Sequence, residues 1–226
     1  MIKNVNDLKT SDLAAIGMNY GYSRTRRHPS AKPFIKQTQN GIDSIDLEFT
    51  ISQMKTAIEF LKSVQASGRQ ILFVGVKPET RQKIKEIALS IGAPYVAERF
   101  IGGTLTNYPQ IKKRSDKLAD LLKKKENGDL DVYTKKEKLL IERDIARLDK
   151  NFGGISNLTT LPGAIVMIDS RHENMCVLEA KQLKIPVVSL SNTDSNLDLV
   201  DYPVVGNDAS VASIEQFLTV VRTSLV

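Results

Sequence analysis

Residues 71–91 read Ile-Leu-Phe-Val-Gly-Val-Lys-Pro-Glu-Thr-Arg-Gln-Lys-Ile-Lys-Glu-Ile-Ala-Leu-Ser-Ile. The four apolar residues closed by Gly75 predict a strand buried on both faces. The periodic stretch from Glu79 to Ile91 predicts the helix that follows, and Pro78 suits its first turn, where a missing N–H does no harm. This stretch therefore predicts a strand followed directly by a helix.

The same order of elements returns later in the chain. Two more apolar runs lie at residues 164–168 and 185–190, with helical periodicity at residues 173–182 and 208–221. Upstream, residues 49–64 carry apolar side chains at the i, i+3, i+4, i+7 spacing of one helix face. Alternating strands and helices predict an α/β fold with a parallel sheet and helices on both of its faces.

The segment from about residue 109 to residue 152 is rich in lysine and carries only a narrow apolar stripe. Such a stripe suits two helices that pack mainly on each other, so we predict a helical hairpin that projects from the sheet. Gly128 suits the turn, and Thr134-Lys-Lys-Glu137 is a capping box that opens the returning helix. The alternative is two ordinary helices of the main domain. We expect one α/β domain over residues 1–226, with this hairpin inserted and a basic N-terminal arm at residues 1–40.

Positive charge is segregated along the chain. The 226 residues carry 32 Lys and Arg against 26 Asp and Glu, a formal net charge of +6. Residues 1–40 hold 7 basic and 2 acidic residues, and residues 99–150 hold 14 and 9, whereas residues 151–226 hold 4 and 8. Clustered cations neutralise phosphates and release their counterions, so the pattern favours a nucleic-acid partner. A merely solvated charged surface is the alternative.

Composition excludes several classes of protein. One cysteine and two histidines cannot build a disulfide scaffold or a zinc finger, and they fit a reducing compartment. No apolar run approaches the ~20 residues that span a bilayer, and the first residues lack the apolar segment of a secretory signal. We therefore expect no membrane partner and no export.

Catalytic and cofactor motifs are weak. The turn Gly75-Val-Lys-Pro-Glu-Thr80 has neither the three glycines of a dinucleotide fingerprint nor a Gly-Lys-Ser/Thr phosphate loop. Asp169-Ser-Arg-His172 places an acid, a hydroxyl and a base together, but neighbours in sequence usually point apart, so we expect His172 at the surface of a helix start. Cys176 is expected to be a buried small hydrophobe. The loop Asn192 to Asp198 lacks the glycine and glutamate of a calcium loop. We predict no catalytic residue, metal or cofactor.

Several segments are recognisable together, in order and with their spacing kept. They include Gly17-Met-Asn-Tyr-Gly21, Thr25-Arg-Arg-His-Pro29, Lys32-Pro-Phe-Ile35, Asn40-Gly-Ile-Asp-Ser-Ile-Asp-Leu47, Leu72-Phe-Val-Gly75, Arg99-Phe-Ile-Gly-Gly-Thr-Leu-Thr-Asn107, Lys135-Lys-Glu137, Phe152-Gly-Gly-Ile155, Leu161-Pro162, Ile185-Pro186 and Gly206-Asn-Asp208. In these segments the chain resembles the bacterial-type family of small-subunit ribosomal protein two, over its whole length. The Gly-Gly-Thr-Leu-Thr-Asn string is the most specific of them.

The resemblance implies a Rossmann-like, flavodoxin-like domain with a protruding helical hairpin and no enzymatic activity. It implies binding to small-subunit ribosomal RNA between the head and body of the subunit, on the solvent side. The implied protein partners are neighbouring small-subunit ribosomal proteins, including the large messenger-binding ribosomal protein one in bacteria that possess it. The implied location is a bacterial cytoplasmic ribosome or, for an organellar chain, a mitochondrial or plastid ribosome.

The chain departs from the family pattern at five places. These are Tyr22 for the usual histidine, Arg27-His-Pro-Ser-Ala31 for Trp-Asn-Pro-Lys-Met, Phe100 for a tryptophan, Asn192-Thr-Asp194 for Asp-Thr-Asn, and Leu197 for a proline. They put in doubt the contacts of those side chains and any metal site built on the family's histidines. The loss of two tryptophans is typical of a divergent lineage, such as a reduced bacterium or an organelle.

The predicted RNA-binding residues fall into three groups, and their contacts are expected to be with phosphate rather than with a base sequence. The N-terminal group is Arg24, Arg26, Arg27, Lys32 and Lys36, the loop group is Arg99, Gly102, Gly103, Thr104 and Asn107, and the hairpin group is Lys112, Lys113, Arg114 and Lys117. For the two glycines, a tight turn that aims the hairpin is an equally good interpretation. Tyr22 could stack on an unpaired base, whereas Tyr20 is expected in the core.

Two other classes of function remain as alternatives. A nucleotide-dependent enzyme on a Rossmann-like fold would bind a mononucleotide or dinucleotide saturably. A pure protein-interaction scaffold would show no salt-sensitive association with RNA.

Overall fold

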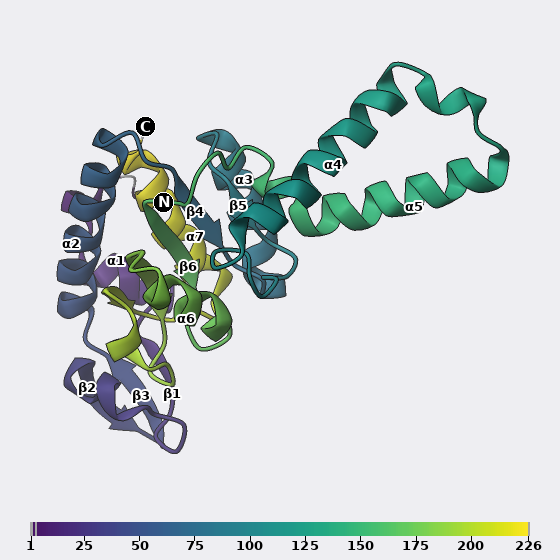
Figure 1. The fold of residues 1–226 in the computed structure, drawn as a ribbon. Helices are drawn as coiled ribbons and strands as arrows, with labels where there is room; N and C mark the ends of the chain where they lie inside the picture. Colours follow the sequence, from purple (N-terminus) through teal and green to yellow (C-terminus); the bar gives the residue numbers. More distant parts are fainter. Residues whose placement is uncertain (1, 3, 226) are drawn as a thin grey trace.

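The computed structural model describes residues 2 and 4–225, and its centre is a five-stranded parallel sheet (Figure 1). The strands are β4 (Ile71–Val74), β5 (Tyr95–Val96), β6 (Ala164–Ile168), β7 (Val187–Ser191) and β8 (Tyr202–Val205). Their order across the sheet, β5-β4-β6-β7-β8, is that of a flavodoxin-like fold. The predicted α/β, Rossmann-like architecture is confirmed.

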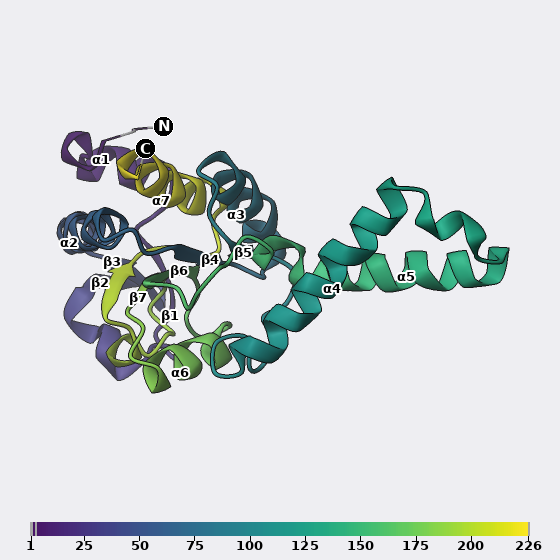
Figure 2. The same ribbon diagram turned by 45° about the horizontal axis from the view of Figure 1, so that its top comes forward.

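Each face of the sheet is covered by its own apolar core. Ile71 and Phe73 of β4 face one core, whereas Leu72 and Val74 face the other, as the two-residue period of a strand requires. Figure 2 shows the two helical layers on either side of the strands. The long helices of the first layer are α2 (Leu47–Ala66), α3 (Pro78–Ser90) and α7 (Val211–Ser224), and the second layer holds α6 (Asn174–Gln182).

The N-terminal segment folds as a small antiparallel sheet, which was not predicted from the sequence. Its strands are β1 (Tyr20–Ser23), β2 (Ile35–Gln39) and β3 (Ile42–Ile45), in the order β1-β3-β2, after the short helix α1 (Thr10–Ala15). The N–H of Tyr22 donates to the Thr193 hydroxyl (3.0 Å) and the N–H of His28 donates to the Thr193 carbonyl (2.8 Å). These bonds dock the small sheet on the loop after β7.

The hairpin consists of α4 (Tyr108–Glu126) and α5 (Lys135–Phe152), and it projects from the domain (Figure 1). Gly128 follows α4 in a left-handed conformation with φ of 79°, and the Thr134–Glu137 capping box opens α5 as predicted. The base of the hairpin shares the core beneath the sheet, where Ile111, Leu148 and Phe152 lie in one apolar cluster with Leu72 and Met167. The two helices are therefore fastened to the domain through packing and not only through their connections.

The remaining elements are short 3-10 helices of one or two turns. They are η1 (Val5–Asp7), η2 (Pro29–Phe34), η3 (Asp129–Val132), η4 (Gly153–Ile155) and η5 (Leu197–Leu199). The predicted strands and helices are all present, with ends shifted by a few residues, and β5 and β8 were missed. The prediction for Tyr20 was wrong, because this residue, at the start of β1, is 59% exposed.

Candidate nucleic-acid interface

Four cations of the predicted N-terminal group lie on the surface of the small sheet and its connecting turns. Arg24, Arg26, Lys32 and Lys36 are exposed, and we call these four residues the N-terminal cationic face. Within the described part of the chain, no ion pair involves Arg24, Lys32 or Lys36. Their charges are therefore available to an anionic partner.

Arg27, the fifth member of the group, is engaged inside the protein. Its Nε lies 2.8 Å from Oδ2 of Asp43 and its Nη2 lies 2.7 Å from Oδ1, a bidentate pair. Asp43 is 1% exposed, and its Oδ1 also accepts the Thr38 hydroxyl at 2.7 Å. This pair ties the turn after β1 to β3, so Arg27 shapes the face without lying on it.

Arg26 is half-exposed and ordered by its neighbours. Its guanidinium lies 4.5 Å from the centre of the Tyr22 ring, and its Nη2 lies 3.5 Å from Oδ2 of Asp194. Arg171 approaches the same carboxylate oxygen at 2.5 Å and its side chain is 55% exposed. Two arginines thus share one carboxylate, which leaves donors of both guanidiniums free for phosphate. Sequence reasoning missed Arg171, since 145 residues separate it from Arg26.

The loop that precedes α4 is wrapped around a buried carboxylate. Glu179 of α6 is 7% exposed, and its two oxygens accept the N–H of Gly103 at 2.6 Å, of Leu105 at 3.0 Å and of Thr106 at 3.1 Å, together with the Thr106 hydroxyl at 3.1 Å. Gly103 can turn its amide inward because it adopts a positive φ of 88°. The loop therefore resembles an anion-binding nest whose anion belongs to the protein itself.

The other residues of the loop group lie in different surroundings. Thr104 is buried at 3% exposure and its hydroxyl donates to the carbonyl of Ile101 at 2.6 Å. Arg99, Gly102 and Asn107 are exposed. The Asn107 side chain makes no capping bond to α4. Of this group, Arg99 is thus the one cation, and it lies on the surface.

The hairpin group lies along the first half of α4. All four side chains are exposed. Lys117 pairs with Asp144 of α5 at 2.7 Å, and Lys112 donates to the carbonyl of Thr159 at 3.4 Å. Lys113 and Arg114 make no ion pair within the described residues. The structure therefore does not bring the hairpin group and the N-terminal cationic face together, because the hairpin and the small sheet lie at opposite ends of the molecule (Figure 1).

The carboxyl edge of the parallel sheet, where ligands bind in folds of this class, is filled by side chains. Lys77, which follows β4, forms ion pairs with Asp169, which follows β6, and with Asp208. The Lys77 Nζ lies 3.4 Å from Oδ2 of Asp208. Burial alone would lower the pKa of Lys77, but Asp208 and Asp169 outweigh it and raise this pKa to about 12. Asn192 also donates to Asp208 at 3.3 Å. A charged network thus occupies the position that a nucleotide would take.

The side chains of Asp169 and His172 do not form a catalytic pair, because Asp169 Oδ1 accepts the backbone N–H groups of Arg171 and His172, both at 3.0 Å, and not the imidazole. The His172 ring is half-exposed and contacts Glu173, whose pKa is raised mainly by burial. Cys176 is fully buried, as predicted, and burial raises the pKa of its thiol well above the usual range. Among the residues that the structure describes, no three His, Cys, Asp or Glu are placed to hold a metal ion. Over the same residues, no helix combines the length and apolar character of a membrane span.

The chain is similar to known proteins along almost its whole length. The model of the family Ribosomal protein S2 matches residues 13–226. The small ribosomal subunit protein uS2 of Endomicrobium trichonymphae is 36% identical over 214 residues, which are 95% of this chain and 88% of that protein. The uS2 proteins of Acidothermus cellulolyticus and Syntrophobacter fumaroxidans are each 39% identical, over 95% and 92% of this chain and 78% and 76% of their own lengths. A match of this extent, with the motifs in order along a flavodoxin-like sheet, shows that the chain belongs to the Ribosomal protein S2 family.

Proposed function

We propose that this chain is a structural constituent of the small ribosomal subunit and that it holds small-subunit ribosomal RNA at two separate surfaces. Family membership supports the structural, non-enzymatic role. The first surface is the N-terminal cationic face with Arg171, and the second is the exposed side of α4 with Lys112, Lys113, Arg114 and Lys117, next to Arg99.

The observation that carries the choice of surfaces is the difference in how the cations are used. Arg27 forms an ion pair with a buried carboxylate. The cations of the N-terminal cationic face instead project from the same small sheet and form few or no ion pairs with protein carboxylates. Guanidinium and ammonium groups that lack protein partners gain most from phosphate, because contact releases condensed counterions. Gly103 and Thr104 act instead by holding the base of α4 in place.

The partners that we propose are ribosomal RNA and neighbouring small-subunit ribosomal proteins, including the large messenger-binding ribosomal protein one. The bacterial relatives favour a ribosome in a bacterial cytoplasm, with a mitochondrial or plastid ribosome as the alternative.

Gradient sedimentation tests the function directly. The full chain should travel with small ribosomal subunits, and a chain that stays at the top of the gradient would contradict the proposed role. The surfaces are tested by the double variant Arg26→Ala with Lys32→Ala. Log affinity falls as log salt rises, and the steepness of this line should decrease by about 1.4 to 1.8 in the double variant. Each of the two phosphates that the variant no longer neutralises contributes ~0.7 to 0.9 to that decrease.

The matched control removes two exposed charges from α2, at Lys55 and Lys62. This control should keep the wild-type slope. A pure protein-interaction scaffold would show no salt-dependent RNA association in any of these proteins, which would dispose of the RNA surfaces.

A further inference from the structure

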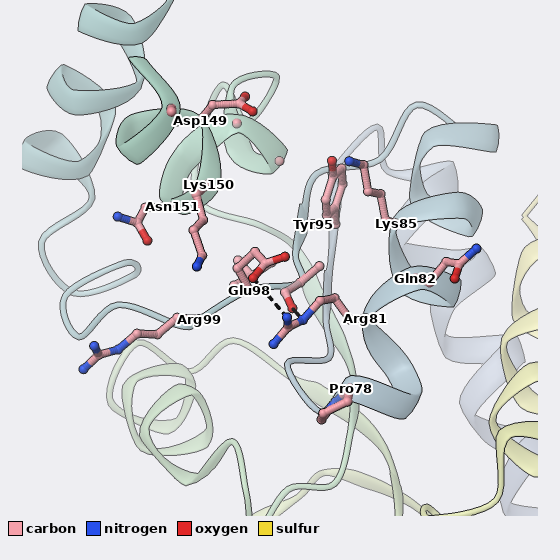
Figure 3. Close-up of a pocket in the computed structure, with 15 residues that line it drawn as sticks. Pro78, Arg81, Gln82, Lys85, Tyr95, Glu98, Arg99, Asp149, Lys150 and Asn151 are labelled. Carbon is pink, nitrogen blue, oxygen red and sulfur yellow. Dashed lines mark hydrogen bonds and ion pairs between the residues drawn. The ribbon is translucent and has the colours of Figure 1, made fainter. Parts of the chain in front are cut away.

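A cleft separates α3 from the base of the hairpin, and Figure 3 shows the side chains that line it. Its volume is about 700 Å³. The floor is the edge strand β5 with residues 97–99, one wall is α3, and the other is the end of α5 with the turn at residues 153–154. This is the volume of a small-ligand site, typically about 300–1,000 Å³, and much less than a nucleic-acid duplex would need.

The walls of the cleft are firmly placed. A Cβ at Gly154 would overlap the carbonyl oxygen of Tyr95, so the turn after α5 lies directly on the edge strand. On the other wall, Arg81 donates from Nε to the carbonyl of Ala97 (3.1 Å) and from Nη2 to the carbonyl of Val76 (3.3 Å). Both walls are therefore anchored to the floor, the first through the Arg81 side chain and the second through the turn at residues 153–154.

The cleft carries a surplus of positive charge. Four cations line it against two carboxylates, and one of those carboxylates, Glu98, is already paired with Arg81 at 3.2 Å. Lys85, Arg99 and Lys150 are exposed and make no ion pair within the described part of the chain. In Figure 3, Lys150 reaches down from α5 toward the space beside Glu98, whereas the Arg99 side chain leaves the loop on the side opposite Arg81 and Tyr95.

The neutral side chains at the cleft are not equivalent. Gln82 and Asn151 lie on opposite walls, but the Gln82 amide donates to Glu86 at 2.8 Å, and in Figure 3 both amides point away from the space between the walls. Tyr95 is half-buried at the upper end of the cleft, beside Lys85 (Figure 3). Cations for phosphate and an aromatic ring for contact with a base are groups with which proteins bind unpaired nucleotides.

We propose that this cleft binds a single, unpaired strand of ribosomal RNA, with Arg99, Lys150 and Lys85 on its phosphates. The proposal rests on the proposed function and adds to it the class of RNA and the place of entry. Arg99 was predicted from the sequence, but Lys85 and Lys150 join it only through the fold, since they come from α3 and α5. A duplex would meet the hairpin from outside, whereas one strand can enter between its base and α3.

The test uses the full chain assembled into small subunits. A cysteine introduced as Asn151→Cys carries a tethered iron chelate, and the buried Cys176 does not compete for the reagent. Hydroxyl radicals from this position should cut one short unpaired stretch of the RNA. Cuts spread along a duplex, or no cuts above background, would overturn the proposal.

A second variant distinguishes RNA bound inside the cleft from RNA that is held only by the overall positive charge of the protein. Ala146→Trp places a bulky ring on the α5 wall without changing any charge, and it should reduce the cutting from position 151 at least fivefold. Arg99→Ala with Lys150→Ala should lower the salt slope by about 1.4, at ~0.7 for each contact with a single strand. The control pair Lys55→Ala and Lys62→Ala should leave the slope unchanged. Cutting and slope that stay at wild-type values in both cleft variants would refute the assignment.

The outcome also distinguishes this proposal from the proposed function. A chain that travels with small subunits but gives no cuts from position 151 keeps the function and loses the cleft. Isothermal titration of the isolated chain with adenosine monophosphate tests whether the cleft binds a free mononucleotide instead. Saturable micromolar binding would assign the cleft to a free mononucleotide and overturn the RNA strand, whereas no measurable heat is the expected result.

Discussion

Replacement of Glu179 by glutamine should loosen the loop that holds the base of the hairpin. One carboxylate oxygen of Glu179 accepts the Gly103 N–H, and the other accepts three donors from Leu105 and Thr106. A glutamine has one acceptor oxygen, which is best placed on the three donors. Its NH₂ group then faces the N–H of Gly103, so one inward-turned donor loses its partner.

The expected cost follows from this count of donors. An unsatisfied buried donor costs about 1–3 kcal/mol, and Glu179→Gln also removes the charge that strengthens the other bonds. Glu179→Ala leaves three N–H groups without an acceptor, which should lower the free energy of unfolding by about 3–9 kcal/mol before the loop relaxes. Since a domain is typically stable by about 5–15 kcal/mol, the alanine variant should open the loop or unfold the chain.

Urea denaturation of the full chain measures these losses, and hydrogen exchange at the three loop amides shows where they occur. The control is Glu215→Gln, because Glu215 forms a surface ion pair with Lys83 at 2.8 Å that contributes about 0–1 kcal/mol. Equal losses for the two glutamine variants, or rapid exchange of the loop amides in the wild type, would show that the carboxylate does not hold the loop.

Three further outcomes follow from buried ionisable groups. Arg27→Ala leaves the Asp43 carboxylate without its guanidinium, so it should lower the free energy of unfolding measured in urea by about 3–5 kcal/mol. Arg24→Ala should lower it hardly at all. Similar losses for the two variants would contradict the structural role of Arg27. Burial, with the nearby charge of Asp169, raises the pKa of Asp208 from 3.8 to about 7. The folded state therefore binds this proton more tightly than the unfolded state, so the stabilising contribution is present at low pH and is lost as the pH rises from about 4 to about 7. Asp208→Asn should be less sensitive to pH than the wild type between pH 5 and pH 8, and parallel curves of unfolding free energy would exclude this account. Cys176 should react with a thiol reagent only on unfolding, because it is buried and its pKa is raised; prompt labelling of the native chain would contradict this.

The parallel sheet could be predicted from the sequence where its strands are buried on both faces. β4, β6 and β7 are continuous apolar runs, whereas β5 has only two residues and β8 contains Pro203, so neither gives a recognisable pattern. The small sheet was missed because β2 is polar and largely exposed. Its one clear signal was Asn40-Gly41, where both residues have positive φ, at 50° and 77°, as a tight hairpin turn requires.

The candidate site was less predictable, because pairing across long separations decides which cations are free. Arg27 and Arg24 look alike in sequence, yet only Arg27 meets a buried carboxylate. Nothing in the Gly102-Gly103 string shows that Glu179, 76 residues away, accepts its amide. The motif correctly marked a structurally demanding loop, but it did not identify the group around which the loop folds.

The shared core at the base of α4 and α5 has a mechanical consequence. With 19 residues at about 1.5 Å each, α4 is a rod of roughly 28 Å, and its lower end is embedded in the same apolar cluster as Leu72 and Met167. Such a rod has no free hinge where it enters the domain. Side-chain packing at its base, and not the connecting loops alone, therefore sets the direction in which this rod leaves the domain.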